Sequence, residues 1–420
     1  MSTSQTIELC LASQHFFPTH GGAQLRFLRY LPGLRDRGIC TRVLSGTPKL
    51  KKKAEQRGAS LPRKLNSNAS QSAEPIQGIP IHRVHLPGRA GWPRSIVFNQ
   101  ALFSYCTGPD YRPDVVQVVS SLQPRSLPWV IRLQQMGIPV VYAYTIPATM
   151  PSNPVKRAFR RWTLQMLYRQ VDCLVVNSAV MRDLSLQIGV RTRFEVIPNG
   201  VDLKRFRPAA NPEERRALRA SLGVGDHQKM ITIVGAVHPR KGSDVLLEAW
   251  KELIAQFPDT HLFLVGLRKD LQYPKLDGFR ARLQAAIAAS GAGDRVHFTG
   301  TVRNPEDYLR ASDVFAFPSQ REGLPNAVLE AMASGVPVVL TPFLGLSDDL
   351  GRPGTEYLLA DRNPVSLAAT IAEILQNRDL ATRLGENGRR WVERTMDLER
   401  SLDRYASLYR GLAETAGRRR

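Results

Sequence analysis

The sequence predicts an α/β protein with two doubly wound domains, each built on a mostly parallel sheet. Three observations favour this fold. Short apolar runs alternate with amphipathic stretches in both halves of the chain. The length of 420 residues and the hydrophobic content of 43% suit two globular cores. No apolar run reaches the roughly 18 residues of a membrane-spanning helix, and the N-terminus lacks the basic region of a secretory signal, so we expect neither.

In the first half, seven apolar runs predict strands. They span residues 7–12, 40–45, 79–86, 115–119, 139–144, 173–177 and 194–197. Amphipathic stretches at 23–37, 123–136 and 155–170 predict helices between them.

The stretch 155–170 allows two interpretations. Its apolar residues recur at helical spacing: Val155, Phe159, Trp162 and Met166. Its basic residues fall elsewhere: Lys156, Arg157, Arg160 and Arg161. A basic amphipathic helix can lie on a membrane surface. An apolar stripe more often faces a protein core, and we therefore expect these four apolar side chains to be buried.

The second half repeats the alternation. Strands are predicted at 230–234, 261–265, 296–299, 313–317 and 336–340. Helices are predicted at 243–257, 279–289 and 325–334. An Asn-Gly turn followed by Pro208 marks a boundary near 201–210. We therefore expect domains at 1–203 and 204–396, followed by a C-terminal segment at 397–420.

Two further segments have a distinct character. Residues 398–412 predict a helix with one apolar side made of Leu402, Tyr405, Leu408, Tyr409 and Leu412. Residues 47–78 contain no aromatic residue and end in a Ser/Asn/Gln-rich run, which predicts a long mobile loop.

Charge is the unusual bulk property of this chain, because its formal net charge is +21. Residues 1–203 hold 26 Lys and Arg against 10 Asp and Glu, whereas residues 204–420 hold 32 against 27. This asymmetry indicates that the first domain meets an anionic partner: a nucleic acid, an anionic membrane surface or an anionic glycan. We favour a membrane surface, approached through the basic residues Lys49, Lys51, Lys52, Lys53 and Arg57. The alternative is a solvated loop that only aids solubility.

The cysteines and histidines predict no metal site. Cys10, Cys40, Cys106 and Cys173 lack metal-ligand spacing, and the eight histidines form no cluster in the sequence. Free cysteines in apolar runs suit a reducing compartment, so we expect a cytoplasmic protein.

The most informative stretch is 321–339, REGLPNAVLEAMASGVPVV. Gly323 lets the backbone approach a ligand, and Pro325 suits the first turn of a helix. After Gly323, Leu324 and Pro325, the amides of Asn326, Ala327 and Val328 are expected to be free to bind a phosphate. Glu330, about one turn further, can accept two ribose hydroxyls, and Glu322 lies nearer to whatever the phosphate carries. This pattern predicts a nucleotide-sugar site. An ordinary helix start with two solvated acids is the alternative.

Two other motifs fit a phosphate ligand. Arg240 and Lys241 follow the strand that ends at Gly235, and two cations beside a helix start can neutralise a departing pyrophosphate. Gly21 and Gly22 precede the first helix, where backbone amides can approach a phosphate. Their alternatives are a solvated basic turn and a flexible turn.

These segments together resemble the retaining glycosyltransferases of the GT-B fold, in particular glycosyltransferase family 4. The matching stretches are FPTHGGAQ, VIPNGVDLKRF, VGAVHPRKG, FTGTV, ASDVFAFPS and the Glu-x7-Glu of 321–339. The resemblance implies two Rossmann-like domains facing across a cleft, a donor site in the second, and a last helix that crosses back onto the first. It also implies that the base lies against the backbone after FTGTV, near Val302, and that Asn199 borders the cleft, although its turn could be only a hinge.

The chain departs from the family at two positions. Ala236 stands where many members have an arginine, and Arg240 is expected to supply that charge. Thr145 stands where members commonly have a histidine that contacts the donor sugar. A threonine can hydrogen-bond a sugar hydroxyl but cannot act as a general base, which affects donor choice or rate.

The sequence therefore predicts a hexosyltransferase that moves a sugar, with retention, from a nucleoside diphosphate sugar to a glycan or lipid-linked acceptor. We expect catalysis by Glu322, Arg240 and Lys241, with no metal or other cofactor. A nucleotide-sugar epimerase of the same fold is the alternative. A nucleic-acid binding protein is a weaker one, because aromatic residues are only 7% and the most basic loop has none.

Overall fold

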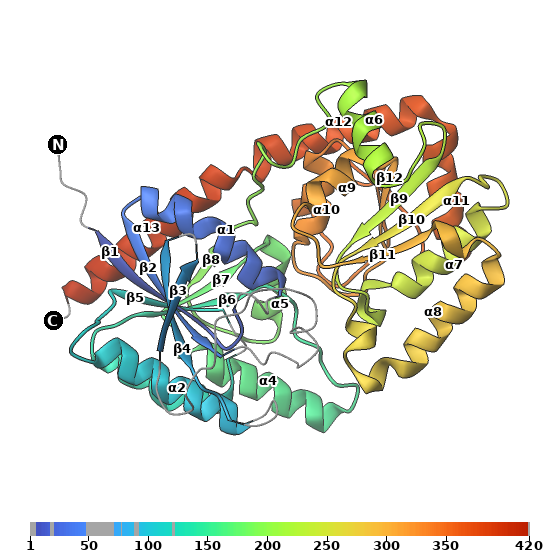
Figure 1. Cartoon of the computed structure of the whole chain (residues 1–420). Helices are drawn as coiled ribbons and strands as arrows, with labels where there is room; N and C mark the ends of the chain where they lie inside the picture. Colours follow the sequence, from blue (N-terminus) through green and yellow to red (C-terminus); the bar gives the residue numbers. More distant parts are fainter. Residues whose placement is uncertain are drawn as a thin grey trace. The chain divides into compact units, whose positions relative to one another are not determined.

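The computed structural model describes residues 6–16, 21–47, 71–76, 78–87, 92–119 and 122–418. The chain divides into two compact units (Figure 1), one formed by Met1–Ile197 with Glu399–Arg420 and the other by Pro198–Leu398. The domain boundaries predicted from the sequence were 203/204 and 396/397, within a few residues of those in the structure.

The first unit contains an eight-stranded sheet among its described residues, in the order β3-β4-β2-β1-β5-β6-β7-β8. Every neighbouring pair is parallel except β3 and β4. The strands are β1 Ile7–Ser13, β2 Ile39–Gly46, β3 Gln71–Ile76, β4 Ile79–Val84, β5 Val115–Val118, β6 Val140–Tyr144, β7 Cys173–Val176 and β8 Phe194–Val196. The helices are α1 Gly22–Asp36, α2 Trp92–Thr107, α3 Leu127–Gln135, α4 Pro154–Tyr168, α5 Ala179–Gln187 and α13 Leu398–Gly417. The seven predicted strands are all present.

Strand β3 corrects the predicted loop at 47–78. Its residues Gln71–Ile76 pair antiparallel with β4 at the edge of the sheet. Their Ser, Ala, Glu and Pro content gives no strand signal, so backbone pairing with β4 decides their conformation. Residues 48–70, with the basic residues from Lys49 to Arg57, lie outside the described residues.

Helix α13 belongs to the first unit although it ends the chain (Figure 1). Its buried side is the apolar side that the sequence pattern predicts, and it packs on the first unit, as the family resemblance implies. The Tyr405 ring lies 5.5 Å from that of Phe27 on α1, and the Tyr409 hydroxyl donates to Gln117 on β5 at 3.2 Å. Arg37, after α1, pairs with Asp403 at 2.6 Å. These contacts join α13 to the first domain.

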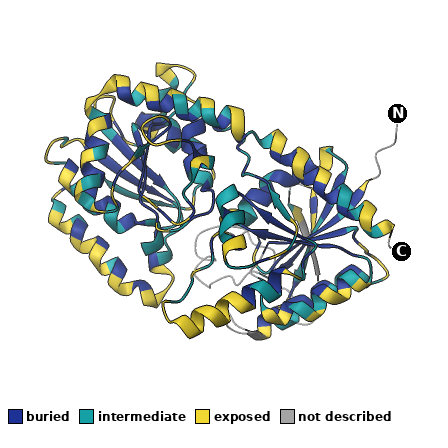
Figure 2. Cartoon of the chain, turned by 180° about the vertical axis from the view of Figure 1, so that it is seen from behind, coloured by how far each residue is buried: buried dark blue, intermediate teal, exposed yellow. Residues whose placement is uncertain are grey.

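Helix α4 contradicts the prediction for its apolar stripe. Its buried residues are Thr163, Leu164, Leu167 and Tyr168, all in its C-terminal half. Val155, Phe159 and Trp162 are exposed, by 75%, 67% and 52%. The helix packs through a side about half a turn away from the predicted stripe, and its N-terminal half extends beyond the core (Figure 2).

The second unit contains a six-stranded parallel sheet in its described part, in the order β11-β10-β9-β12-β13-β14. The strands are β9 Lys229–Val234, β10 Thr260–Val265, β11 Val296–Gly300, β12 Val314–Phe317, β13 Val338–Leu340 and β14 Leu358–Leu359. The helices are α6 Pro212–Ser221, α7 Ser243–Leu253, α8 Asp277–Ser290, α9 Pro305–Ala311, α10 Asn326–Ala333, α11 Pro364–Gln376 and α12 Arg378–Thr395. The order reverses between β9 and β12, and ligands of such sheets bind at the carboxyl ends of the strands at this point.

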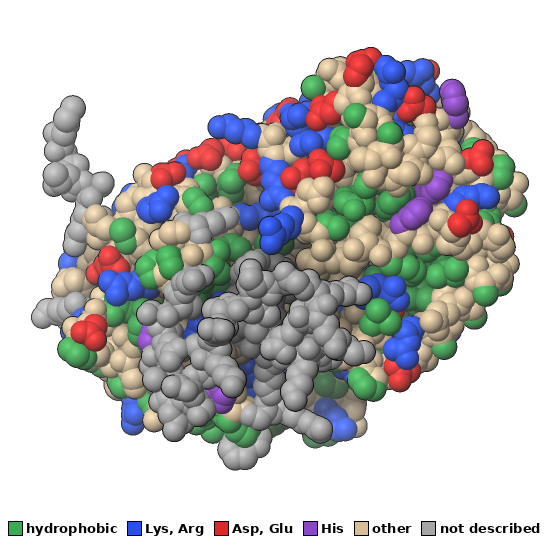
Figure 3. All heavy atoms as spheres, in the orientation of Figure 1, with side chains coloured by type: hydrophobic (Ala, Val, Ile, Leu, Met, Phe, Trp, Pro, Cys, Tyr) green, Lys and Arg blue, Asp and Glu red, His purple; other side chains and the backbone are tan. Residues whose placement is uncertain are grey.

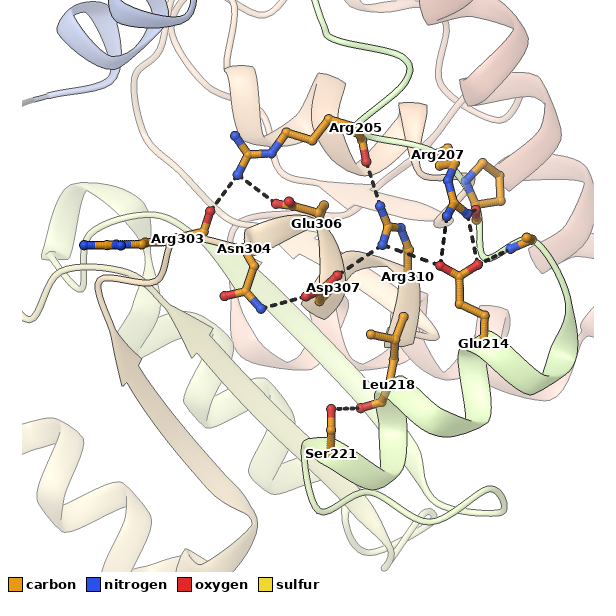
Figure 4. A network of polar contacts seen from close by, with 12 residues as sticks. Arg205, Arg207, Glu214, Leu218, Ser221, Arg303, Asn304, Glu306, Asp307 and Arg310 are labelled. Atoms are coloured by element: carbon orange, nitrogen blue, oxygen red, sulfur yellow. Dashed lines mark hydrogen bonds and ion pairs between the residues drawn. The ribbon is translucent and has the colours of Figure 1, made fainter. Parts of the chain in front are cut away.

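A network of arginines fixes the start of the second unit to its helices (Figure 4). Arg205 donates to Arg303 O at 2.6 Å and pairs with Glu306 on α9, while Arg310 donates to Arg205 O at 2.9 Å. Arg207 makes two 3.0 Å hydrogen bonds to Glu214 on α6 and lowers the pKa of that half-buried carboxyl to about 2. Side chains of both signs lie close together around α6 and α12 (Figure 3). The network therefore holds the segment that follows Asn199 in place.

Among the described residues, no helix is both long and apolar enough to span a membrane.

Candidate functional site

The loops after β9 and β12 meet at the carboxyl edge of the second unit's sheet. The amide of Gln320 donates to Arg240 O at 2.9 Å, and the Ser319 hydroxyl donates to the same oxygen at 3.0 Å. The sheet order thus brings together two segments that lie about 80 residues apart in the chain.

Glu322 is the centre of this meeting point. Its side chain is buried, and its Oε1 accepts a hydrogen bond from Arg240 Nη1. The same oxygen lies 2.8 Å from Lys241 Nζ and accepts from the Ser319 hydroxyl at 2.8 Å. Arg240 Nη1 also donates to Arg321 O at 2.7 Å. The three residues predicted to be catalytic are therefore in direct contact.

The electrostatics of the cluster keep Glu322 ionised. Burial raises the pKa of Glu322, but the charges of Lys241 and Arg240 outweigh burial, and the net pKa lies below its usual value. Burial also lowers the pKa of Lys241, and the negative charge of Glu322 offsets this lowering only in part. One carboxylate against two cations leaves an excess of positive charge, which suits an anionic ligand.

Helix α10 begins one residue later than predicted. Its first residue is Asn326, and Pro325 is the N-cap, with an extended backbone. Pro325 O accepts from the amides of Val328 at 3.1 Å and Leu329 at 3.3 Å. The prediction that the Val328 amide is free is therefore wrong, because this amide donates to the carbonyl of the N-cap residue Pro325 within the first turn of the helix. The buried Glu330 lies one turn beyond Asn326, as expected from the sequence.

Asn199 connects the start of the second unit to this turn. It is buried, and its Nδ2 donates to Leu324 O and to Asn326 Oδ1, both at 2.6 Å. A hinge turn alone would not require these bonds. Asn199 therefore shapes the segment between Gly323 and Asn326.

Two further predicted donor residues, Gly235 and Val302, lie at the same sheet edge. Gly235 directly follows β9, and a Cβ there would lie 3.5 Å from Lys241 Cε, so the two are neighbours. Val302 lies just after β11, but its side chain packs against a small apolar cluster that includes Met230 and Phe263. A contact between a ligand and residue 302 would therefore involve its backbone.

In the first unit, the predicted glycines and Thr145 follow strands β1 and β6. Gly22 begins α1, and Gly21 is its N-cap. The Gly21 amide donates to Gln24 Oε1 at 3.0 Å. The prediction that this amide is free to bind a phosphate is therefore wrong. Thr145 is half-buried, and its carbonyl accepts from Asn177 at 3.5 Å. Its contact with a donor sugar stays a prediction.

Sequence reasoning missed two residues of the cluster. Ser319 hydrogen-bonds Glu322, and the Ser-x-x-Glu spacing could have indicated it. His238 accepts from the Arg240 amide through Nδ1 at 3.0 Å, which orients the loop that carries both cations. Burial, and then the nearby charges of Lys269 and Arg240, lower the pKa of His238, so it is neutral at physiological pH. In the part of the chain described here, no three His, Cys, Asp or Glu residues are placed to hold a metal ion.

Gly242 permits the close packing of the two loops, and its replacement gives a test. It has φ +73°, and a Cβ would lie 2.1 Å from Pro318 O. We expect Gly242→Ala to destabilise the second unit by about 2–4 kcal/mol, from left-handed strain and from the clash. Thermal unfolding measures the effect. Gly223→Ala is the matched control, because φ is also +73° but nothing lies within 4 Å. Equal losses in both variants would contradict this packing.

Comparison with known proteins matches two families along this chain. Residues 21–200 match the glycosyl transferase 4-like domain, and residues 214–391 match the glycosyl transferases group 1. The two matches together cover most of the sequence, one in each half.

Curated relatives match over part of their length. A GDP-mannose-dependent monoacylated alpha-(1-6)-phosphatidylinositol monomannoside mannosyltransferase of Corynebacterium glutamicum is 30% identical over 243 residues, which cover 56% of this chain and 60% of the relative. The lipopolysaccharide core biosynthesis mannosyltransferase LpsB of Rhizobium meliloti is 29% identical over 220 residues, covering 52% and 60%. The matched part of this chain thus spans less than two thirds of these relatives.

Solved structures share the fold over nearly the whole chain. A sucrose-phosphate synthase from Thermosynechococcus elongatus superposes with a TM-score of 0.75 at 22% identity, covering 97% of this chain and 100% of the other. Anabaena Alr3699/HepE, solved with UDP and glucose, superposes with a TM-score of 0.73 at 18% identity, covering 96% and 100%. The likeness confirms the predicted α/β fold with two Rossmann-like domains.

Proposed function

Because this chain belongs to the group 1 glycosyl transferases of glycosyltransferase family 4, with the GT-B fold, we propose that it transfers a sugar from a nucleoside diphosphate sugar to an acceptor, with retention of configuration. The observation that carries the proposal is the Glu322–Arg240–Lys241 cluster at the switch point of the second sheet. An anion site with a buried carboxylate at its centre suits a ligand that is a diphosphate at one end and a sugar at the other.

Each residue of the cluster has a role in this reaction. Negative charge develops on the departing diphosphate as the glycosyl bond breaks, and Arg240 and Lys241 stabilise it. The side-chain hydrogen bonds and ion pairs of Glu322 with described residues all involve Oε1, so we assign Oε2 to a hydroxyl of the sugar. The leaving phosphate accepts the proton of the attacking hydroxyl, and no side chain is needed as a base.

Helix α10 supplies the rest of the donor site. The amides at its start, at Asn326 and Ala327, face a phosphate at the positive end of the helix dipole. Glu330 accepts hydrogen bonds from two ribose hydroxyls. Asn199 holds the Leu324–Asn326 turn in the shape that this binding requires.

The acceptor is proposed to be a glycan or a lipid-linked glycan, reached at the inner face of the cytoplasmic membrane. One relative is named as a phosphatidylinositol monomannoside mannosyltransferase, and another as a mannosyltransferase of lipopolysaccharide core biosynthesis. These names support transfer rather than epimerisation. The excess of basic residues in the first half fits an anionic surface.

Thermal unfolding with UDP, GDP, ADP and CMP tests the donor site. We expect one nucleoside diphosphate to raise the melting temperature, since a ligand at a hundred times its Kd stabilises by about 2.7 kcal/mol. The matching nucleosides without phosphates are the control and are expected to have little effect. If none of the nucleotides shifts the transition, the cluster does not bind a nucleotide. Consumption of a donor sugar nucleotide without transfer would favour an epimerase instead.

A further inference from the structure

The N-terminal half of α4 is an apolar and basic surface that the sugar-transfer reaction does not use. Val155, Phe159 and Trp162 are exposed by 75%, 67% and 52%, and the rings of Phe159 and Trp162 lie 5.9 Å apart. Apolar side chains of this size on one side of a protruding helix form a contiguous patch. We call Val155, Phe159 and Trp162 the α4 patch.

The α4 patch points away from the domain core. The helix contacts its own domain through Thr163, Leu164, Leu167 and Tyr168, which are buried. At 100° per residue, these four positions centre about 150° around the helix from the patch. The packing of α4 within its own domain therefore leaves the patch uncovered. Figure 2 shows most of this half of the helix as exposed.

Basic side chains occupy the opposite side of the same turns. They are Lys156, Arg157, Arg160 and Arg161, and Pro154–Tyr168 contains no Asp or Glu. Arg157 donates to Pro151 O and Ser152 O, and Arg161 donates to Ile188 O. These partners are neutral carbonyls. In the described structure none of the four forms an ion pair with a carboxylate, so their charge is available to an anionic partner.

We propose that the N-terminal half of α4 lies in the headgroup region of an anionic membrane. The α4 patch is inserted, Lys156 and Arg161 contact the phosphates beside it, and Arg157 and Arg160 add positive charge on the side that faces water. A helix with separate apolar and basic sides has this arrangement at a bilayer surface. Lys156 and Arg161 flank the patch and can reach the headgroups on either side. Guanidinium groups bind phosphate through two parallel hydrogen bonds, which suits lipid headgroups.

Two other occupants fit the surface less well. A second copy of this chain would place like charges next to each other around the patch, which disfavours a symmetric contact. A single-stranded nucleic acid needs aromatic rings within a basic groove, whereas here the aromatic and basic residues lie on opposite sides of the helix. The segregation of the two residue types favours a bilayer.

Co-sedimentation of the full chain with vesicles tests the proposal. The vesicles contain phosphatidylcholine and phosphatidylglycerol in equal amounts, or phosphatidylcholine alone. We expect binding to the anionic vesicles only, weakened by salt. The double variant Phe159→Ser, Trp162→Ser and the quadruple glutamine variant of the basic residues should each lower the partition coefficient by at least about tenfold. Both sets of side chains are exposed, so the variants should fold.

A matched control variant and a second measurement show whether a loss of vesicle binding is specific to the α4 surface. Leu271→Ser with Tyr273→Ser removes two exposed apolar side chains of the second unit, which are 59% and 46% exposed, and should leave vesicle binding unchanged. Nucleotide-induced thermal shifts should persist in every variant, since the docking surface does not depend on the donor site. The inference would be overturned by vesicle binding that survives the Phe159/Trp162 change. It would also be overturned by Trp162-dependent binding to an oligonucleotide without vesicle binding, or by a dimer that this change dissociates.

Discussion

Replacing Arg240 and Lys241 together by alanine is expected to slow sugar transfer by roughly ten- to a thousandfold. Both cations contact Glu322, and the excess positive charge of the cluster is what a departing diphosphate would meet. Steady-state kinetics with the donor identified by thermal shift gives the measurement.

The same change also affects folding, because it leaves the buried carboxylate of Glu322 with only the Ser319 hydroxyl among its described side-chain partners. The single variant Arg240→Gln therefore accompanies the double one, together with melting temperatures for both. Lys251→Ala is the control for loss of a lysine, since Lys251 pairs with Glu248 on the surface of α7. Full activity in a folded double variant would mean that the diphosphate is held elsewhere.

Glu330→Ala is expected to lower nucleotide affinity by about 1.5–3 kcal/mol, because two ribose hydroxyls lose a charged acceptor. Glu322→Gln is expected to leave free-nucleotide affinity nearly unchanged and to lower kcat, since its partner is the sugar. Calorimetry with the nucleoside diphosphate alone separates the two effects. Glutamine rather than alanine at residue 322 keeps an oxygen for Arg240, Lys241 and Ser319.

One result would contradict this division of roles between Glu322 and Glu330. If both variants lost nucleotide affinity equally, Glu322 would act by holding the cations for the phosphate and not by touching the sugar. The cluster would then be a phosphate site with a structural carboxylate.

Much of the fold was predictable because buried parallel strands leave a strong sequence record. The seven strands expected in the first half and the five in the second are all present. Strand β3 was missed because its residues QSAEPI have little apolar pattern, and β14 was missed because two leucines, Leu358 and Leu359, are too short a run to predict a strand. Each lies at a sheet edge. The helix at 155–170 was placed correctly, but its buried side was not. Helical spacing shows that an apolar stripe exists and does not show whether a core lies beneath it.

The sequence by itself determined the α/β class, and it predicted the candidate site residues Glu322, Arg240, Lys241 and Glu330 and the strands that precede them. It could do so because glycines, prolines and charged residues at strand ends leave local patterns. Only the tertiary structure decided that Arg240 and Lys241 share one oxygen of Glu322, that Asn199 holds the turn before α10, and that the α4 patch faces away from the core. These contacts join residues far apart in the chain, and they follow from strand order and helix rotation, which local sequence periodicity does not encode.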